Sequence, residues 1–395
     1  MGTGKSKLIL YFILFLIFVS IHMQFPVFTP LAVSLGAGSM LVALMLSVTS
    51  FVNLGGNLIA GSVIDRLGVR GFIVFPLFLL SISLFAHSFV TITIHLFILR
   101  VLNGFILAFL TPACMTMLAS FAQNRLEQSK NMAMNTLMVT AAMTVAPVLG
   151  GWLGERYGAD GAYYMISFTT FIAFLLAFYY LPSGKKTNGF GRKKSPLISL
   201  FTYPPLAPVF LTAFVMMYTQ GTIMYELPFL SVESNVSKGA VGKMAGFIGL
   251  GTFFVLTFVF LHRISPKVRT IIGLLLMSIS VCLMMFSGIV PPLKTFFLFG
   301  IASGMVFPAM MTLVTESIDE QNRGKAFAFL SAIFSVGTII SPFVSGLVRD
   351  YMSPYYIAWI VLMIVTTIIG LQFMTSKNAP GRPPHTTPTT KVAGF

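Results

Sequence analysis

The sequence predicts an all-α membrane protein with twelve transmembrane helices in two pseudo-symmetric six-helix bundles. Composition, the spacing of charged residues and an internal repeat lead to this prediction. Charged residues make up 9% of the chain and hydrophobic residues 56%, with a mean hydropathy of +0.90. Soluble domains carry about 25% charged residues. The excess of apolar residues therefore indicates a chain that lies in a bilayer.

The spacing of the charges predicts the number of helices. Eleven stretches without Asp, Glu, Lys or Arg are each long enough for the roughly 20 residues that a spanning helix needs. They are 8–64, 71–99, 101–124, 131–154, 161–184, 195–225, 244–262, 270–293, 295–315, 326–348 and 351–376. The first is interrupted between Thr29 and Ser39 by Pro30, Gly36 and Gly38, so we expect it to hold two helices, which gives twelve.

Lysine and arginine residues predict the orientation. With both termini in the cytoplasm, inner loops and tails hold 19 of them, outer loops hold five, and Arg100 is the remaining one. Cytoplasmic loops of membrane proteins are enriched in these residues. We therefore expect a multi-pass protein of the inner or plasma membrane. The same bias accounts for most of the net charge of +15, which consequently does not indicate nucleic-acid binding.

The two halves of the chain share a pattern. A proline, the glycine four positions on and the acid eight positions on recur 195 positions later: Pro147, Gly151 and Glu155, then Pro342, Gly346 and Asp350. Parallel six-helix repeats with a substrate site between them are typical of secondary transporters. A duplication without transport is the alternative. The predicted domains are a bundle at 1–181, a basic linker at 182–205, a bundle at 206–376 and a disordered tail at 377–395.

Other classes of protein are poorly supported. Outer loops are too short to form a ligand-binding domain, and no span carries a serine–histidine or paired-carboxylate arrangement, so we expect no enzyme. Gly2-Thr3-Gly4-Lys5-Ser6 resembles the end of a phosphate-binding loop but lacks its leading glycine and strand. Cys114 and Cys282 lie in predicted spans, and we interpret them as small core residues. The histidines lack metal-ligand spacing, and we expect neither a metal nor a cofactor.

The segment Gly61-Ser62-Val63-Ile64-Asp65-Arg66-Leu67-Gly68-Val69-Arg70 follows the second predicted helix. It resembles the loop signature of the major facilitator superfamily, whose final basic residue is replaced here by glycine. The resemblance implies the superfamily fold. It also implies a cytoplasmic gate made of Gly61, Asp65, Arg66, Gly68 and Arg70, in which the carboxylate faces a helix N-terminus. The alternative is an ordinary solvated turn.

Arg100 is expected inside the fourth span, where a buried charge is a functional hypothesis by default. The segment from Leu99 to Gly104 resembles the arginine signature of this span in the superfamily, and the resemblance implies a role in proton coupling. The alternative is that the long side chain of Arg100 extends to the outer interface.

The fifth span indicates the direction of transport. Pro147, Gly150 and Gly151 resemble the antiporter motif of the superfamily, although Ala146 replaces its glycine. A proline and paired glycines favour a bendable, closely packed helix. In the superfamily the motif is typical of exporters. The spaced prolines of the first span, Pro26 and Pro30, are similar to those of drug/proton antiporters.

Glu226 is the only acid expected inside a span; the other nine fall in loops or at helix ends. Met224 to Leu230 resembles an acidic segment in the seventh span of multidrug exporters, which implies that Glu226 carries protons. Pro228 leaves open that the helix ends early and places Glu226 in an outer vestibule.

The resemblance to twelve-helix drug/proton antiporters covers the whole chain. It implies a monomer in membrane lipids that exports small amphiphilic or cationic molecules in exchange for protons, with the proton gradient as energy source. Polar and aromatic side chains of the spans are candidates for the cavity: Gln24, Phe28, Asn57, Asn135, Tyr218, Gln220 and Tyr225. A dedicated exporter of one metabolite, metallophore or glycolipid, or a proton-coupled importer, remains the alternative.

Overall fold

The computed structural model describes residues 3–182, 206–258, 263–286, 292–318 and 323–377. Within these ranges the regular secondary structure is helical. Most of the predicted linker (183–205) and the predicted tail (378–395) lie outside the described residues.

The helices follow one another in the order that the charge-free stretches predict. The first half contains α1 (Thr3–Met23), α2 (Phe25–Ser34), α3 (Ser39–Leu67), α4 (Gly71–Ala86), the 3-10 helix η1 (His87–Phe89), α5 (Thr93–Ser120) and α6 (Arg125–Tyr180). The second half contains α7 (Ala207–Glu226), the 3-10 helix η4 (Leu227–Phe229), α8 (Leu230–Glu233), α9 (Lys238–Thr257), α10 (Pro266–Met285), α11 (Pro292–Ser317), α12 (Arg323–Val348) and α13 (Pro354–Lys377).

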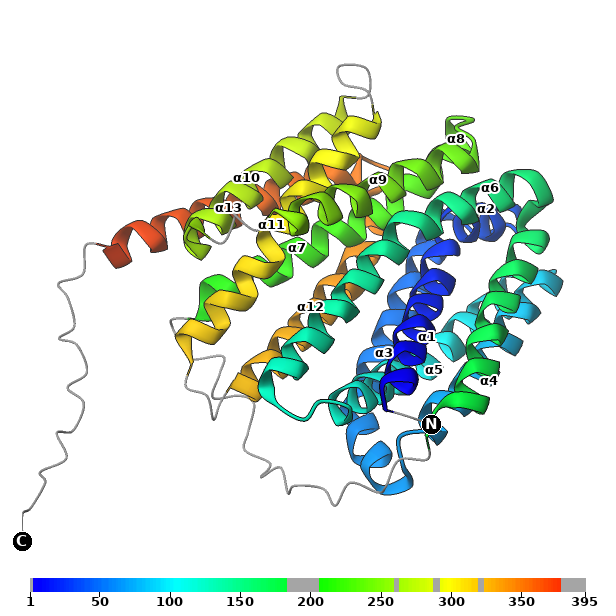
Figure 1. The fold of residues 1–395 in the computed structure, drawn as a ribbon. Coiled ribbons are helices and arrows are strands. Elements are labelled where there is room, and N and C mark those ends of the chain that lie inside the picture. The colour runs from blue at the N-terminus through cyan, green and yellow to red at the C-terminus, as the bar shows by residue number, and fades with distance from the viewer. Residues whose placement is uncertain (1–2, 183–205, 259–262, 287–291, 319–322, 378–395) are drawn as a thin grey trace, which may run out of the picture.

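Eleven helical segments of the described residues are long and apolar enough to cross a membrane. The first long stretch divides as predicted, since one segment covers Gly4–Ser34 and the next begins at Ser39. In Figure 1 the first half lies to the right and the second half to the left, with α12 beside α3.

The helix α6 is 56 residues long and contains one non-helical residue, Gly158, with φ 73° and ψ −176°. A straight helix of this length would extend about 84 Å, far beyond a hydrocarbon core of about 30 Å. Glycine adopts positive φ without steric cost. The chain therefore reverses near Gly158, and Figure 1 shows the two segments of α6 running in opposite directions.

The two ends of the bundle are distinguished here by the helix ends that lie there. The end where α1 begins and α13 finishes is called the terminal end. The opposite end, which contains α2, α8 and the turn at Gly158, is called the distal end (Figure 1).

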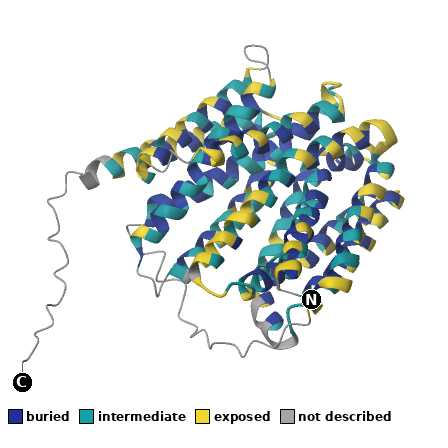
Figure 2. Ribbon diagram, in the orientation of Figure 1, coloured by how far each residue is buried: buried dark blue, intermediate teal, exposed yellow. Residues whose placement is uncertain are grey.

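The buried side chains form two hydrophobic clusters. One lies within α1 to α6 and includes only Tyr225 and Phe229 from the second half, whereas the other lies within α7 to α13. Large apolar side chains such as Phe168, Phe178 and Ile360 are exposed on outer helices. Exposed positions recur along these helices in Figure 2. Such a surface suits lipid, because acyl chains are as apolar as leucine.

Candidate functional site

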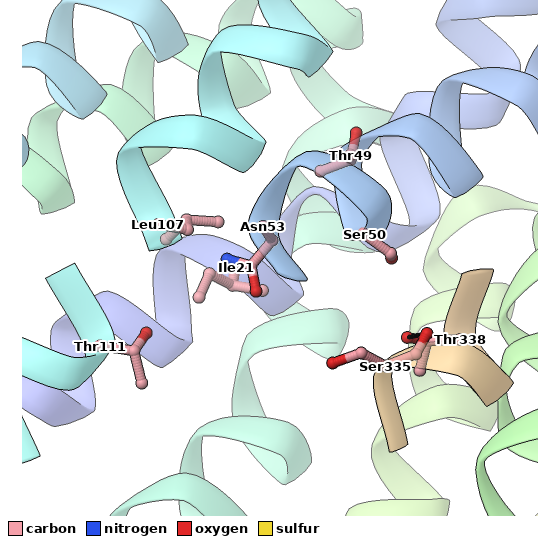
Figure 3. A pocket seen from close by; sticks show the side chains of 8 residues that line it. All are labelled: Ile21, Thr49, Ser50, Asn53, Leu107, Thr111, Ser335 and Thr338. Atoms are coloured by element: carbon pink, nitrogen blue, oxygen red, sulfur yellow. Dashed lines mark hydrogen bonds between the residues drawn. The ribbon is translucent and has the colours of Figure 1, made fainter. Parts of the chain in front are cut away.

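A cavity of about 270 Å³ lies between the halves, roughly midway along the helices. Its volume is close to the lower end of the range of about 300–1,000 Å³ for small-molecule pockets. The lining residues come from α1, α3, α5 and α12 (Figure 3): Ile21, Thr49, Ser50, Asn53, Leu107, Thr111, Ser335 and Thr338. Six of the eight carry a hydroxyl or amide group and none is charged. The cavity therefore offers neutral hydrogen-bonding groups to a solute.

The α3–α12 seam closes the distal side of the cavity. The Ser47 hydroxyl donates a hydrogen bond to the Ile339 carbonyl at 2.8 Å, next to the lining residue Thr338. Farther toward the distal end, Gly346 of α12 lies against Ala43 and Met40 of α3. A side chain on Gly346 would collide with Ala43, so the absence of a Cβ permits the contact.

The α6–α9 seam is the second contact between the halves. Gly242 of α9 lies against the Pro147 carbonyl, and Gly246 and Gly249 lie against Thr144. A Cβ on any of the three would overlap α6. These contacts run from Gly242, near the distal start of α9, to Gly249, about halfway along that helix.

The antiporter-like glycines of α6 lie at two different helix contacts. Gly150 faces the Met23 carbonyl of α1, and Gly151 faces the Lys238 carbonyl at the start of α9. A Cβ at either position would overlap these backbone atoms. Both glycines therefore permit the close helix packing that the motif predicts, one within the first half and one across the halves.

The seven cavity residues expected from the sequence do not line the described cavity. Gln24, Phe28, Tyr218 and Tyr225 are buried in contacts between helices. Gln24 donates to the Ser20 carbonyl at 3.0 Å, and the Tyr225 hydroxyl donates to the Ser39 carbonyl at 2.9 Å.

The other three predicted residues are half-buried. Asn57 comes nearest to the cavity, since its amide donates to the lining residue Asn53 at 2.9 Å. Asn135 and Gln220 are half-buried positions outside the lining. Of the seven, Asn57 of α3 is the one that hydrogen-bonds to a lining residue, and the set stays a prediction for the substrate site.

Arg100 lies inside the first half, and 8% of its surface is exposed. It lies about 10 Å along α5 from the start of that helix at Thr93. Its guanidinium carbon lies 3.5 Å from the centroid of the Phe28 ring, and Nη2 donates to the Tyr163 hydroxyl at 3.4 Å. The Tyr163 ring stacks on His87 with centroids 4.7 Å apart. Arg100 is thus buried and held by aromatic groups inside the first half.

Glu226 is the last residue of α7 and is 8% exposed. It forms an ion pair with Arg349, which directly follows α12. The same guanidinium donates to Glu233 at 2.7 Å and lies 3.9 Å from the centroid of the Phe229 ring. Burial opposes the charge of Arg349, but hydrogen bonds and attraction from both carboxylates outweigh it and raise its pKa. The structure therefore places Glu226 in a charged cluster at the distal end, and Glu226 does not line the described cavity.

The gate motif is only partly described. Gly61, Asp65 and Arg66 belong to the last turns of α3, and their side chains lie outside the described residues. Gly68 ends the helix with φ 99°. Arg70 donates to the Phe178 carbonyl in the last turn of α6 at 2.6 Å, where carbonyls lack helical partners and a cation is favourable.

Sequence reasoning misses two features of this arrangement. Counting lysine and arginine residues by loop assigns Arg349 to an outer loop, where it has no predicted role. The next residue, Asp350, is the last member of the repeated proline–glycine–acid pattern. The cavity residues Ser335 and Thr338 have a detectable signal, because hydroxyls spaced three apart share a helix face. Among the described residues, no cluster of histidine, cysteine and acidic groups could hold a metal ion.

A family model for the Major Facilitator Superfamily matches residues 10–298 and 271–393. The chain belongs to this superfamily. It is therefore a multi-pass membrane transporter and not an enzyme. The multi-drug resistance efflux pump PmrA of Streptococcus pneumoniae is 25% identical, with 91% of this chain and 94% of PmrA covered. The quinolone resistance protein NorA of Staphylococcus aureus is 22% identical, covering 90% and 93%.

Solved structures of the superfamily share the fold of this chain. The nucleoside transporter NupG aligns with a TM-score of 0.73 and 16% identity over 95% of this chain and 100% of its own. A bacterial homolog of the human lysosomal transporter Spinster, in an inward-facing and unoccupied conformation, aligns with a TM-score of 0.76 and 15% identity, over 97% and 99%. At these identities the likeness establishes the fold and not the substrate.

Proposed function

We propose that the protein is a proton-coupled efflux antiporter for small amphiphilic or cationic molecules, which works by alternating access. The main support is the cavity, which is lined by residues of both halves and closed on its distal side. In a two-bundle transporter, this is where a substrate exposed alternately to each side would bind. The efflux pumps among the relatives support the direction of transport.

The topology proposed for this function has twelve spans and cytoplasmic termini. Counting the two segments of α6 separately gives six spans in each half. The positive-inside bias then assigns the terminal end to the cytoplasm. With this assignment, the structure corresponds to the state that is closed toward the outside. We expect a monomer surrounded by lipid that uses protons and no cofactor.

Glu226 and Arg100 are the proposed proton-coupling residues. Protonation of Glu226 would remove the charge that holds Arg349 and so loosen the link between the ends of α7 and α12. Arg100 holds an uncompensated positive charge beside Tyr163, because no carboxylate among the described residues forms an ion pair with it. Its field would disfavour a second cation nearby and so affect how protons and cationic substrates share the pathway.

A dedicated transporter of a polar, neutral solute is the second candidate, whether exporter or proton-coupled importer. The observation that favours it is the uncharged lining of hydroxyl and amide groups. Such groups select solutes by hydrogen bonding, and a lining that discriminates by hydrogen bonds rejects analogues lacking the matching group.

The test uses purified protein in liposomes that contain a pH-sensitive dye. Cationic dyes, amphiphilic drugs and nucleosides are added in turn under an imposed proton gradient, with wild type and Glu226→Gln compared. Antiport predicts proton flux that depends on a cationic or amphiphilic solute and is lost in Glu226→Gln. Glu233→Gln is the matched control, because Glu233 binds the same arginine but is mostly exposed.

Each result distinguishes among the candidates. Proton flux coupled only to a polar neutral solute would favour the dedicated transporter. Flux that persists unchanged in Glu226→Gln would exclude Glu226 from coupling, and Arg100 would then be the residue to replace. Transport that ignores the proton gradient would contradict the antiport proposal altogether.

A further inference from the structure

Two acids occupy equivalent positions in the repeat and lie at the distal end. Glu155 follows Pro147 by eight positions, and Asp350 follows Pro342 by the same number. Glu155 lies just before the turn of α6 at Gly158, and Asp350 lies just beyond α12. Both side chains belong to exposed residues. Neither acid has a role in the proposed proton coupling.

Each acid binds the first turn of a helix in the opposite half. The Glu155 carboxylate accepts a hydrogen bond from the Gly239 backbone N–H in the first turn of α9 at 3.0 Å. The Asp350 carboxylate accepts one from the hydroxyl of Ser39, the first residue of α3, at 3.1 Å. The first N–H groups of a helix lack partners and carry partial positive charge, so a carboxylate there is favourable.

The surroundings of the two contacts are also equivalent. Gly151, four residues before Glu155, lies against the backbone of Lys238, the first residue of α9. Gly346, four residues before Asp350, lies against Met40, the second residue of α3. In each half a glycine thus lets the partner helix approach, and an acid one turn later binds its start.

The helix starts leave room for these acids. The N-cap of α3, Gly38, has no side chain and so cannot cap the helix itself. The N-cap of α9, Ser237, accepts a hydrogen bond from the Ala240 N–H and leaves the Gly239 N–H to Glu155. At α9 a carboxylate from the opposite half therefore binds a backbone N–H of the first turn, and at α3 it binds the hydroxyl of the first residue.

We propose that Glu155 and Asp350 are a matched pair of distal latches, positioning residues that hold the two halves together at the distal end. Each latch consists of one carboxylate and the helix start that it binds. The latches stabilise the state in which the cavity is closed distally, and both must separate before the distal end opens. This inference rests on alternating access, as proposed above, but on neither the substrate nor the proton.

Two reporter cysteines measure whether a thiol reagent can reach the distal seam and the cavity. Ser47→Cys is buried in the α3–α12 seam on the distal side, whereas Ser335→Cys lines the cavity at a half-buried position. Each is placed in the full chain after Cys114 and Cys282 have been replaced by alanine. In lipid nanodiscs a hydrophilic thiol reagent reaches both ends. Measuring the labelling rate therefore requires no substrate, no proton gradient and no known orientation of the protein.

The latch variants are Glu155→Ala, Asp350→Ala and their combination. Asp160→Ala is the control, because Asp160 is a nearby acid whose backbone carbonyl, and not its carboxylate, accepts the hydrogen bond from Ser88. We expect each single variant to accelerate labelling at Ser47→Cys about threefold and the double variant about tenfold, since the latches share no residue. Labelling at Ser335→Cys should slow in the same variants.

Opposite changes at the two reporters identify a shift between conformations, whereas loosened packing would raise both rates. Unchanged rates, or faster labelling at both reporters, would overturn the proposal. An effect of only one acid would overturn the matched pair. If the alanine variants do not fold, Glu155→Gln and Asp350→Asn provide the same comparison with smaller changes, because an amide oxygen still accepts the hydrogen bond. Since no transport is measured, failure of the latches is distinguishable from failure of the antiport proposal.

Discussion

Arg349, which is half-buried, and Arg100, which is buried, have different kinds of partner. Arg349 is neutralised by Glu226 and Glu233 and lies over the Phe229 ring. Arg100 has an aromatic ring and a phenol as partners but no carboxylate among the described residues. Removing the partner of a buried charge is costly, whereas removing both partners of a pair can be nearly neutral. The two sites should therefore respond differently to substitution.

We predict that Arg349→Gln destabilises the protein by about 3 kcal/mol, because it leaves the Glu226 carboxylate without its partner. The double variant Arg349→Gln/Glu226→Gln should recover most of this loss. Thermal unfolding of the purified protein measures both. A single variant as stable as the wild type would mean that the ion pair contributes nothing to the fold.

For Arg100 we predict that lysine is not an adequate substitute, since it cannot match the planar contact with Phe28 and the hydrogen bond to Tyr163 together. A desolvated cation–π contact is worth about 2 kcal/mol, so transport by Arg100→Lys should fall about tenfold or more. Arg156→Lys is the control, because Arg156 is exposed and its guanidinium carbon lies 6.0 Å from the centroid of the Trp152 ring. Equal transport by both variants would contradict the prediction.

At the scale of the elements, α6 packs against helices of both halves. Its first segment packs on α1 through Gly150 and on α9 through Gly151. Its second segment ends where Arg70 binds the Phe178 carbonyl. Small residues matter at these contacts because packing, and not the hydrophobic effect, drives helix association in lipid.

We predict that Gly150→Ala destabilises the protein by about 1–3 kcal/mol, since its methyl group would overlap the Met23 carbonyl and push α1 away. Gly370→Ala in α13 is the matched control. It has open space around it and should be neutral or stabilising by up to about 1 kcal/mol, because alanine favours helix over glycine. Thermal unfolding compares the two. If both behaved alike, the close packing of Gly150 would not matter.

At the scale of the whole molecule, the halves meet distally and enclose a cavity near the middle. The lining of the cavity comes mostly from α1, α3 and α5, with Ser335 and Thr338 contributed by α12. A change on α12 can therefore obstruct the cavity without disturbing the core of the first half.

We predict that Thr338→Phe reduces substrate transport at least about tenfold, because the ring would occupy much of a small cavity whose contacts position the solute. Ser331→Phe is the control, since Ser331 is exposed on the same helix and does not line the cavity. Transport by both variants in liposomes, at equal protein incorporation, makes the comparison. Full activity of Thr338→Phe would place the substrate elsewhere.

The helices were largely predictable, whereas the lining of the described cavity was not. The break between Ser34 and Ser39 followed from local proline and glycine residues, which act on the backbone directly. The cavity did not follow, because polarity alone does not tell whether Gln24 or Thr49 faces a neighbouring helix or open space. The ion pairs of Arg349 were likewise not predictable, since its partners Glu226 and Glu233 are more than 100 positions away in the sequence.

By itself, the sequence determined the membrane location, the order of the helices and the family, because each depends on local composition or on a short contiguous motif. The repeat that joins Glu155 with Asp350 was also visible there. Only the tertiary structure decided that these acids bind helix starts in the opposite half and that Glu226 lies with Arg349. Only it placed the cavity among neutral side chains of four helices. The physical reason is that such contacts depend on the rotation and approach of helices far apart in the chain, which the packing of both halves fixes together.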